Sequence, residues 1–345
     1  MTSAVSRQPK TLATRPGSSV AASLDRIIDI VGPDLEKVNA TVLSQMDNPV
    51  PLIPKLAGHI VAAGGKRLRP LLTLACAKLC GYEGNRHVKL AVCVEFIHTA
   101  TLLHDDVVDE SDLRRGAPTA NAVWNNKASV LVGDYLFSRS FEIMVADGSL
   151  KILRTLSAAS ASIAEGEVHQ LATSNDLSTD EEEYLRIITG KTAKLFEASA
   201  QVGAIISDQP QALEDKLGLF GRSIGIAFQL IDDVLDYSAH QATLGKQIGD
   251  DFRNGKITLP VILAYRQGDA VEKDFWRRTF EVQEIQDGDL DRAIELMHNH
   301  GALTETVERA CHYANQATRA LDSFPPSPIH DALGDLVAFA VDRPH

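Results

Sequence analysis

A hydrophobic run long enough to cross a membrane is missing from this chain of 345 residues. No stretch of 18 or more consecutive apolar residues occurs, so we expect no transmembrane segment. A Gly/Ser-rich or Pro-rich linker is also missing from the middle of the sequence. The length alone would permit two domains, but without a linker one large domain is favoured. The composition, 44% hydrophobic and 23% charged, is typical of a globular protein.

Positive charge is in deficit. The chain has 34 lysines and arginines against 46 aspartates and glutamates, which gives a formal net charge of −12. We therefore expect no broad basic surface, and this argues against a protein that binds nucleic acid. A small anionic substrate is not excluded, because a bound divalent cation can invert the local electrostatic field.

Cysteine is scarce, with four residues in total. Cys76 and Cys80 lie four positions apart in an apolar, helix-like run and lack the usual spacing of zinc ligands. With Cys93 and Cys311 they do not form the pattern of a disulfide framework. We interpret all four as small core residues of a protein in a reducing compartment, which predicts a cytoplasmic location.

Alternation of apolar and polar residues, the pattern of a half-buried strand, is nearly absent. Apolar residues recur instead at helical spacing, for example at Leu24, Ile27 and Val31, and sparse turn segments divide the chain into ten or more helices. The sequence predicts an all-α fold, a single large helical bundle over residues 21–345 with the active site in a central cavity. Residues 1–20 are basic and rich in Ser and Thr, as in a transit peptide, but no amphipathic pattern is clear, so we expect a disordered tail.

Two acidic motifs of the form Asp-Asp-x-x-Asp each end a long apolar stretch. Their aspartates are Asp105, Asp106 and Asp109 in the first motif and Asp232, Asp233 and Asp236 in the second. On a helix, positions i, i+1 and i+4 lie close together, so each motif gathers three carboxylates at one place.

An acidic triplet on a helix is usually part of a solvated face. Here apolar residues surround both motifs, among them Leu103 and Val107 in the first and Ile231 and Val234 in the second. Carboxylates in such surroundings carry a large desolvation cost unless a cation neutralises them. Mg²⁺ prefers oxygen ligands and is usually shared between carboxylates and substrate phosphates. The two motifs therefore favour a diphosphate held through Mg²⁺ between two acidic walls.

Basic residues recur beside glycine in four further segments. They are Gly64-Gly65-Lys66-Arg67-Leu68-Arg69-Pro70, Arg114-Arg115-Gly116, Gly190-Lys191-Thr192, which interrupts an apolar helix, and the loop from Gly245 to Lys256. Arginine offers a bidentate fork to phosphate oxygens and lysine a point charge. Each segment alone is a weak signal, but their order along the chain, together with the two acidic motifs, is specific.

This ordered series resembles the motifs of the trans-isoprenyl diphosphate synthases over residues 20–345. The segment from Glu95 to Gly116 is most similar to the octaprenyl and decaprenyl diphosphate synthases that make the ubiquinone side chain. The resemblance implies successive condensation of isopentenyl diphosphate onto an allylic diphosphate, such as farnesyl or geranylgeranyl diphosphate. It also implies Mg²⁺ as cofactor, with about three ions when substrate is bound, a homodimer, and a membrane-seeking product that would draw the enzyme to the membrane periphery.

The resemblance also implies roles for single residues. The six aspartates would bind Mg²⁺ and, with Lys191, form the catalytic group. Residues expected to bind the allylic diphosphate are Arg114, Lys191, Thr192, Gln229, Lys246 and Lys256. Residues expected to bind isopentenyl diphosphate are Lys66, Arg69, His98 and Arg115. Asp250 and Asp251 lack a third aspartate at the right spacing, because position 254 is Asn. They are therefore expected to support the metal ligands at most and not to bind Mg²⁺ themselves.

Product length is expected to depend on how far the growing tail slides along the helix that precedes Asp105. Thr101 and Ala100, four and five residues before it, are both small and would leave the path open. By resemblance, Met144 and Leu156 on neighbouring helices are candidates for the floor of this path. Ordinary core packing is the alternative for both.

Three other functions compete with this interpretation. A short-chain farnesyl or geranylgeranyl diphosphate synthase would carry Phe or Tyr where this chain has Ala100. A terpene cyclase would not need the segment from Gly64 to Arg69. A non-catalytic subunit of a heteromeric synthase would lose an acidic or basic motif, and this chain keeps all of them.

Overall fold

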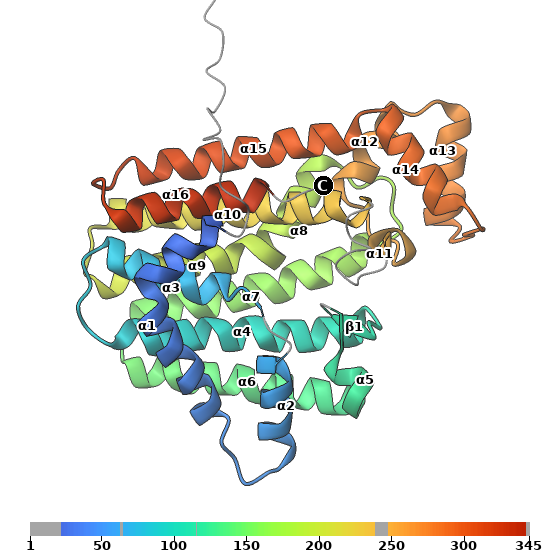
Figure 1. The fold of residues 1–345 in the computed structure, drawn as a ribbon. Helices are drawn as coiled ribbons and strands as arrows, with labels where there is room; N and C mark the ends of the chain where they lie inside the picture. The colour runs from blue at the N-terminus through green and yellow to red at the C-terminus, as the bar shows by residue number, and fades with distance from the viewer. Residues whose placement is uncertain (1–21, 63–64, 115, 239–247, 343–345) are drawn as a thin grey trace, which may run out of the picture.

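A computed structural model of the chain describes residues 22–62, 65–114, 116–238 and 248–342. The predicted all-α fold is confirmed (Figure 1). The helices are α1 (Ala22–Gln45), α2 (Leu52–Ala62), α3 (Leu68–Leu79), α4 (Arg86–Val108), α5 (Ala120–Trp124), α6 (Asn126–Asp147), α7 (Leu150–Thr173), α8 (Glu181–Ile188), α9 (Lys194–Ile206), α10 (Gln211–Asp236), α11 (Asp250–Arg253), α12 (Leu259–Gln267), α13 (Ala270–Trp276), α14 (Asp289–Asn299), α15 (Ala302–Leu321) and α16 (Pro328–Val341), with the π-helical turns η1 (Thr189–Ala193) and η3 (Arg277–Glu281). The tail expected at residues 1–20 lies outside the described residues.

The long helices lie in layers (Figure 1). α6 packs along α4, α4 packs on α3 and α9, α9 packs on α10, and α10 packs on α15. The strand β1 (Leu113–Arg114) follows α4 and the short helix α11 follows α10, and both lie on the right of Figure 1. The two helices that carry the acidic motifs therefore end on the same side of the bundle.

Strands are confined to one small ladder in the part of the chain that the structure describes. β1 pairs with β2 (Ala117–Pro118) in antiparallel register, Arg114 opposite Ala117. This turn brings Arg114 back beside the end of α4. All four cysteines are free, and no described helix combines the length and the apolar character that a membrane crossing requires.

Small residues let α9 and α10 approach closely, and this contact sets the position of the second acidic motif. A Cβ added to Gly221 would lie 2.3 Å from the carbonyl oxygen of Phe196, and one added to Gly225 would lie 2.6 Å from Ala193 Cα. Such distances leave no room for a methyl group. Glycine inside a helix costs roughly 1 kcal/mol relative to alanine, so its presence here indicates that backbone proximity is required.

We predict that Gly221→Ala destabilises the protein by about 1–3 kcal/mol, because the added methyl overpacks the α9–α10 contact. The matched control is Gly334→Ala in α16, where a Cβ meets nothing within 4 Å; it should be neutral or stabilise by up to about 1 kcal/mol. Urea unfolding of both variants measures the difference. Equal stability of the two would contradict the close contact.

Candidate active site

The first acidic motif lies at the C-terminal end of α4, where Asp105 and Asp106 occupy the last turn and Asp109 caps the helix. A cation from a different segment lies against each carboxylate. These pairs are Asp105 with Lys191 Nζ at 3.9 Å, Asp106 with Arg114 Nη2 at 2.7 Å, and Asp109 with Lys256 Nζ at 2.7 Å. The three cations offset the repulsion among three neighbouring negative charges.

The second motif, at the end of α10, consists of Asp232, Asp233 and Asp236. Asp233 is 3% exposed, and its carboxylate accepts hydrogen bonds from the Tyr184 hydroxyl and from Gln229 Nε2, the latter at 2.8 Å. The Thr192 hydroxyl donates to Gln229 Oε1 at 2.9 Å. A chain of hydrogen bonds therefore joins η1, α10 and α8 around this motif. Below, the first wall is the group Asp105, Asp106 and Asp109, and the second wall is the group Asp232, Asp233 and Asp236. Tyr184 did not emerge from the sequence, because its partner lies 49 positions away.

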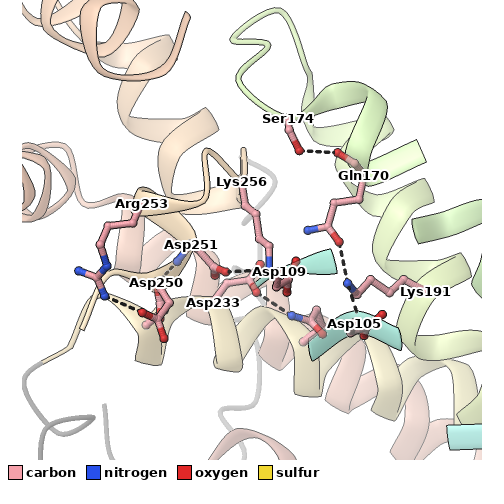
Figure 2. Close-up of polar contacts among 12 residues, drawn as sticks. Asp105, Asp109, Gln170, Ser174, Lys191, Asp233, Asp250, Asp251, Arg253 and Lys256 are labelled. Carbon is pink, nitrogen blue, oxygen red and sulfur yellow. Dashed lines mark hydrogen bonds and ion pairs between the residues drawn. The ribbon is translucent and has the colours of Figure 1, made fainter. Parts of the chain in front are cut away.

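Lys256 joins the two walls (Figure 2). Its ammonium lies 2.7 Å from Asp109 Oδ2 and 3.9 Å from Asp251 Oδ1, and the Asp251 N–H donates to Asp236 Oδ2 at 2.9 Å. Burial lowers the pKa of Lys256, but Asp251 and Asp109 outweigh burial and raise this pKa above its usual value. Asp251 thus links α11 to the second wall and neighbours the cation that reaches the first.

Lys191 extends toward Asp105 from the π-helical turn η1 (Figure 2). Its Nζ also lies 2.6 Å from Glu167 Oε2 and 2.8 Å from Gln170 Oε1, both on α7. Gly166 permits this approach, since a Cβ there would lie 2.5 Å from the backbone nitrogen of Lys191. Glu167 and Gln170 were missed in the sequence. The sequence pattern that could have indicated them is a group of polar residues near the end of α7, whose earlier turns are mostly small and apolar.

A cavity of about 90 Å³ lies among these side chains. Its polar lining includes Lys191, Gln229, Asp233, Asp251 and Lys256. Cations and carboxylates thus face one small hollow, as binding of a metal and an anion together requires. A larger hollow of about 600 Å³ lies at the other end of α4 and contains none of the residues expected at the active site.

Burial shifts the buried carboxylates of the site toward their neutral forms. It raises the pKa of Asp106, which Arg114 partly counteracts. Burial and then the charge of Asp251 raise the pKa of Asp233 well above its usual value. Burial raises the pKa of Glu167 to about 7, with Lys191 acting in the opposite direction. Ionisation of these groups is therefore costly until a further cation arrives.

The donor set fits Mg²⁺. The walls offer carboxylate oxygens, which are the ligands that hard divalent cations prefer. Among the described residues, no three acidic, histidine or cysteine side chains converge closely enough to hold an ion by themselves. Mg²⁺ is commonly shared between one or two carboxylates and substrate phosphates, and each wall can supply that number.

The residues expected to bind isopentenyl diphosphate lie at the start of α3 and within α4. Arg69 Nη1 lies 3.1 Å from His98 Nε2, and its guanidinium lies 4.3 Å from the centre of the Phe196 ring. Lys66 Nζ lies 4.4 Å from the centre of the Phe339 ring on α16. The structure therefore brings Arg69 and His98 together. Two other expected site residues, Arg115 and Lys246, lie outside the described residues.

The expected path of the growing tail is lined by packed side chains. Ala100 is 1% exposed, and the Thr101 hydroxyl donates to the carbonyl oxygen of His98 at 2.7 Å. Met144 and Leu156 are buried in one apolar cluster with Ile97 of α4. This position suits a core residue and a residue at the end of a path equally well.

We predict that the metal-free protein loses stability as pH rises from about 4.5 to about 7, in part through Glu167. Its folded-state pKa is raised, so the folded protein binds more protons than the unfolded chain in this window. Each pKa unit corresponds to roughly 1.4 kcal/mol. In urea unfolding, Glu167→Gln should lose less stability than the wild type between these two pH values. Glu165→Gln, at an exposed position, should lose as much as the wild type. Parallel profiles for all three would contradict the assignment.

Comparison with known proteins identifies relatives of the whole chain. The profile of the polyprenyl synthetase family matches residues 50–297. The octaprenyl diphosphate synthase of Escherichia coli is 46% identical over 325 residues, which cover 93% of this chain and 99% of that protein.

Solved structures agree. The crystal structure of a decaprenyl diphosphate synthase from Rhodobacter capsulatus is 50% identical, covers 92% of this chain and 98% of its own, and superposes with a TM-score of 0.89. A polyprenyl synthase from Caulobacter crescentus, complexed with calcium and isoprenyl diphosphate, is 47% identical. The match covers 95% of this chain and 99% of that one, with a TM-score of 0.90. The chain therefore belongs to the polyprenyl synthetase family and is a long-chain trans-prenyltransferase.

Proposed function

We propose that the chain condenses isopentenyl diphosphate successively onto farnesyl or geranylgeranyl diphosphate and releases octaprenyl or decaprenyl diphosphate, the precursor of a ubiquinone side chain. The observation that carries the proposal is that Lys191 and Lys256 each pair with an aspartate of the first wall and, with Asp233 of the second wall, line one cavity. The names of the E. coli and R. capsulatus relatives support a product of this length.

The six aspartates of the walls would hold Mg²⁺, about three ions with the allylic substrate bound. When bound, the ions neutralise the diphosphate so that it can leave from the allylic carbon. The Caulobacter structure is a complex with calcium and isoprenyl diphosphate, and this supports a divalent cation and a diphosphate as ligands.

The ion pairs of the site suggest how this chain's cations bind the allylic diphosphate. Arg114, Lys191 and Lys256 are each within 4 Å of an aspartate of the first wall. With those carboxylates neutralised by metal ions, the three cations would be available to the phosphate oxygens. Thr192, Gln229 and Lys246 would complete this group. No basic side chain would have to move in from elsewhere, because Arg114, Lys191 and Lys256 would exchange one anionic partner for another.

Isopentenyl diphosphate would bind at Lys66, Arg69, His98 and Arg115. After the C–O bond to diphosphate breaks, its double bond would attack the delocalised allylic carbocation, and loss of one proton would complete the condensation. We propose that the released diphosphate takes that proton. No protein nucleophile is needed, and the chain's part is to bind, orient and neutralise charge.

Exposed apolar side chains on α6 support a homodimer. Leu131 and Val145 are 65% and 66% exposed and lie 14 residues apart, close to four helical turns, so they share one face. We propose that a second copy covers this face in the cytoplasm, with the enzyme at the membrane periphery when product accumulates. Sedimentation equilibrium that gives the single-chain mass of 37.4 kDa would exclude the dimer.

The proposed activity is tested by incubation with farnesyl diphosphate, labelled isopentenyl diphosphate and Mg²⁺, followed by sizing of the product. EDTA should abolish activity and excess Mg²⁺ should restore it. Asp106→Asn and Asp233→Asn should each lower turnover roughly 10²–10³-fold or more, as expected when transition-state charge stabilisation is lost. Asp331→Asn, exposed on α16, should act like the wild type. Near-normal turnover in both wall variants would refute the metal assignment.

We predict that Ala100→Phe shortens the main product to the short-chain class while the first condensations continue. The ring would enter the path about 7.5 Å before Asp105, at 1.5 Å per residue, without contact to either wall. Met144→Trp, further along, should shorten the product less. Melting curves must accompany both, because overpacking can destabilise the bundle. A folded, active Ala100→Phe enzyme with full-length product would show that the tail runs elsewhere.

A further inference from the structure

Arg67 stands between two residues of the proposed isopentenyl diphosphate site, Lys66 and Arg69, but differs from both in its backbone. Its φ of 47° and ψ of 38° are left-handed, at the residue that precedes α3. Side chains other than glycine, asparagine and aspartate rarely adopt this conformation. A residue persists there when the surrounding contacts hold it.

The contact that holds Arg67 is an ion pair with Glu95 on α4. The Arg67 guanidinium donates to Glu95 Oε1, and their side chains are only 12% and 7% exposed. Glu95 as a whole is 5% exposed and thus buried. An ionised carboxylate in such a place requires a partner, since an unpaired buried charge is strongly unfavourable.

The same face of α4 also holds Arg69. Glu95 and His98 are three residues apart and therefore neighbours on the helix surface. Arg67 reaches the first and Arg69 reaches the second, with Arg69 Nη1 at 3.1 Å from His98 Nε2. Two arginines of one short segment thus attach it to α4 at two points one turn apart.

We propose that Glu95, acting through Arg67, is a positioning residue for isopentenyl diphosphate. The pair fixes the left-handed turn before α3 and so sets the places of Lys66 and Arg69. Arg67 is not itself a phosphate ligand, because turning toward substrate would leave the buried Glu95 carboxylate without this partner. The inference rests on the proposed function and adds to it a carboxylate that does not touch substrate.

The test is calorimetric titration with isopentenyl diphosphate, together with steady-state kinetics, on Glu95→Gln. This variant keeps the size and one oxygen acceptor but removes the charge. We expect weaker binding and a higher KM for isopentenyl diphosphate, by roughly tenfold or more, as for a small misplacement of binding groups. The KM for the allylic substrate should change less than twofold. The double variant Arg67→Gln/Glu95→Gln, a neutral hydrogen-bonding pair, should recover part of the lost affinity.

The matched control is Asp289→Asn. Asp289 is 7% exposed and paired with Arg278 at 2.8 Å, and it begins α14, which lies away from α3 in Figure 1. Its loss should lower the melting temperature without changing either KM. If Glu95→Gln lowers the melting temperature like this control but leaves the KM for isopentenyl diphosphate unchanged, or raises both KM values equally, the positioning role is refuted.

A further variant, Lys66→Ala, separates the positioning role from the proposed function. If it weakens binding while Glu95→Gln does not, only the positioning role fails. If the wild type does not bind isopentenyl diphosphate, the proposed function fails.

Discussion

Repulsion among six aspartates at the ends of two apolar helices is the constraint on which the arrangement of the site depends. Each wall alone would be unstable, because the effective cost of an unpaired buried charge is several kcal/mol. The cations that compensate the first wall come from β1, from η1 and from the segment after α11. Electrostatics therefore ties together elements that lie far apart in the sequence. The same contacts that stabilise the fold also gather the groups that a diphosphate requires.

Close helix packing supplies the second requirement, which is accurate placement. Gly221 lets α10 lie against α9, and Gly225 and Gly166 let α10 and α7 lie against η1. Each glycine lowers the helix propensity of its own segment, and each allows a backbone contact that no side chain could replace. As a result Thr192 reaches Gln229, and Lys191 reaches Glu167. The site is built from rigid helices and not from loops, which suits chemistry that depends on orientation.

The sequence predicted the all-α fold and the two acidic motifs, but it missed residues whose partners lie on other helices. Helical spacing and the lack of strand alternation were enough for the all-α fold, and the spacing of the aspartates was enough to place each triplet on one helix face. Glu167, Tyr184 and Glu95 were missed, because their partners Lys191, Asp233 and Arg67 lie 24, 49 and 28 positions away. Local patterns report neighbours on one helix, and these contacts arise only when different helices pack. Lys191 was identified through the ordered series of motifs and their resemblance to a known family, in which Gly190-Lys191-Thr192 stood out as a local irregularity in an apolar helix.

The π-helical turn η1 changes the directions in which the side chains before and after it point. An α-helix turns about 100° per residue, and a π-helical turn accommodates one residue more than an α-helical turn. α8, η1 and α9 form one continuous rod (Glu181–Ile206), but its two halves are out of phase by about that angle. Tyr184 before the turn and Thr192 within it both reach the group around Asp233 because of this phase shift. A single-residue deletion in η1 would restore a regular helix and rotate Tyr184 away while leaving every aspartate in place. The length of this turn therefore matters to the site as much as the identity of its residues.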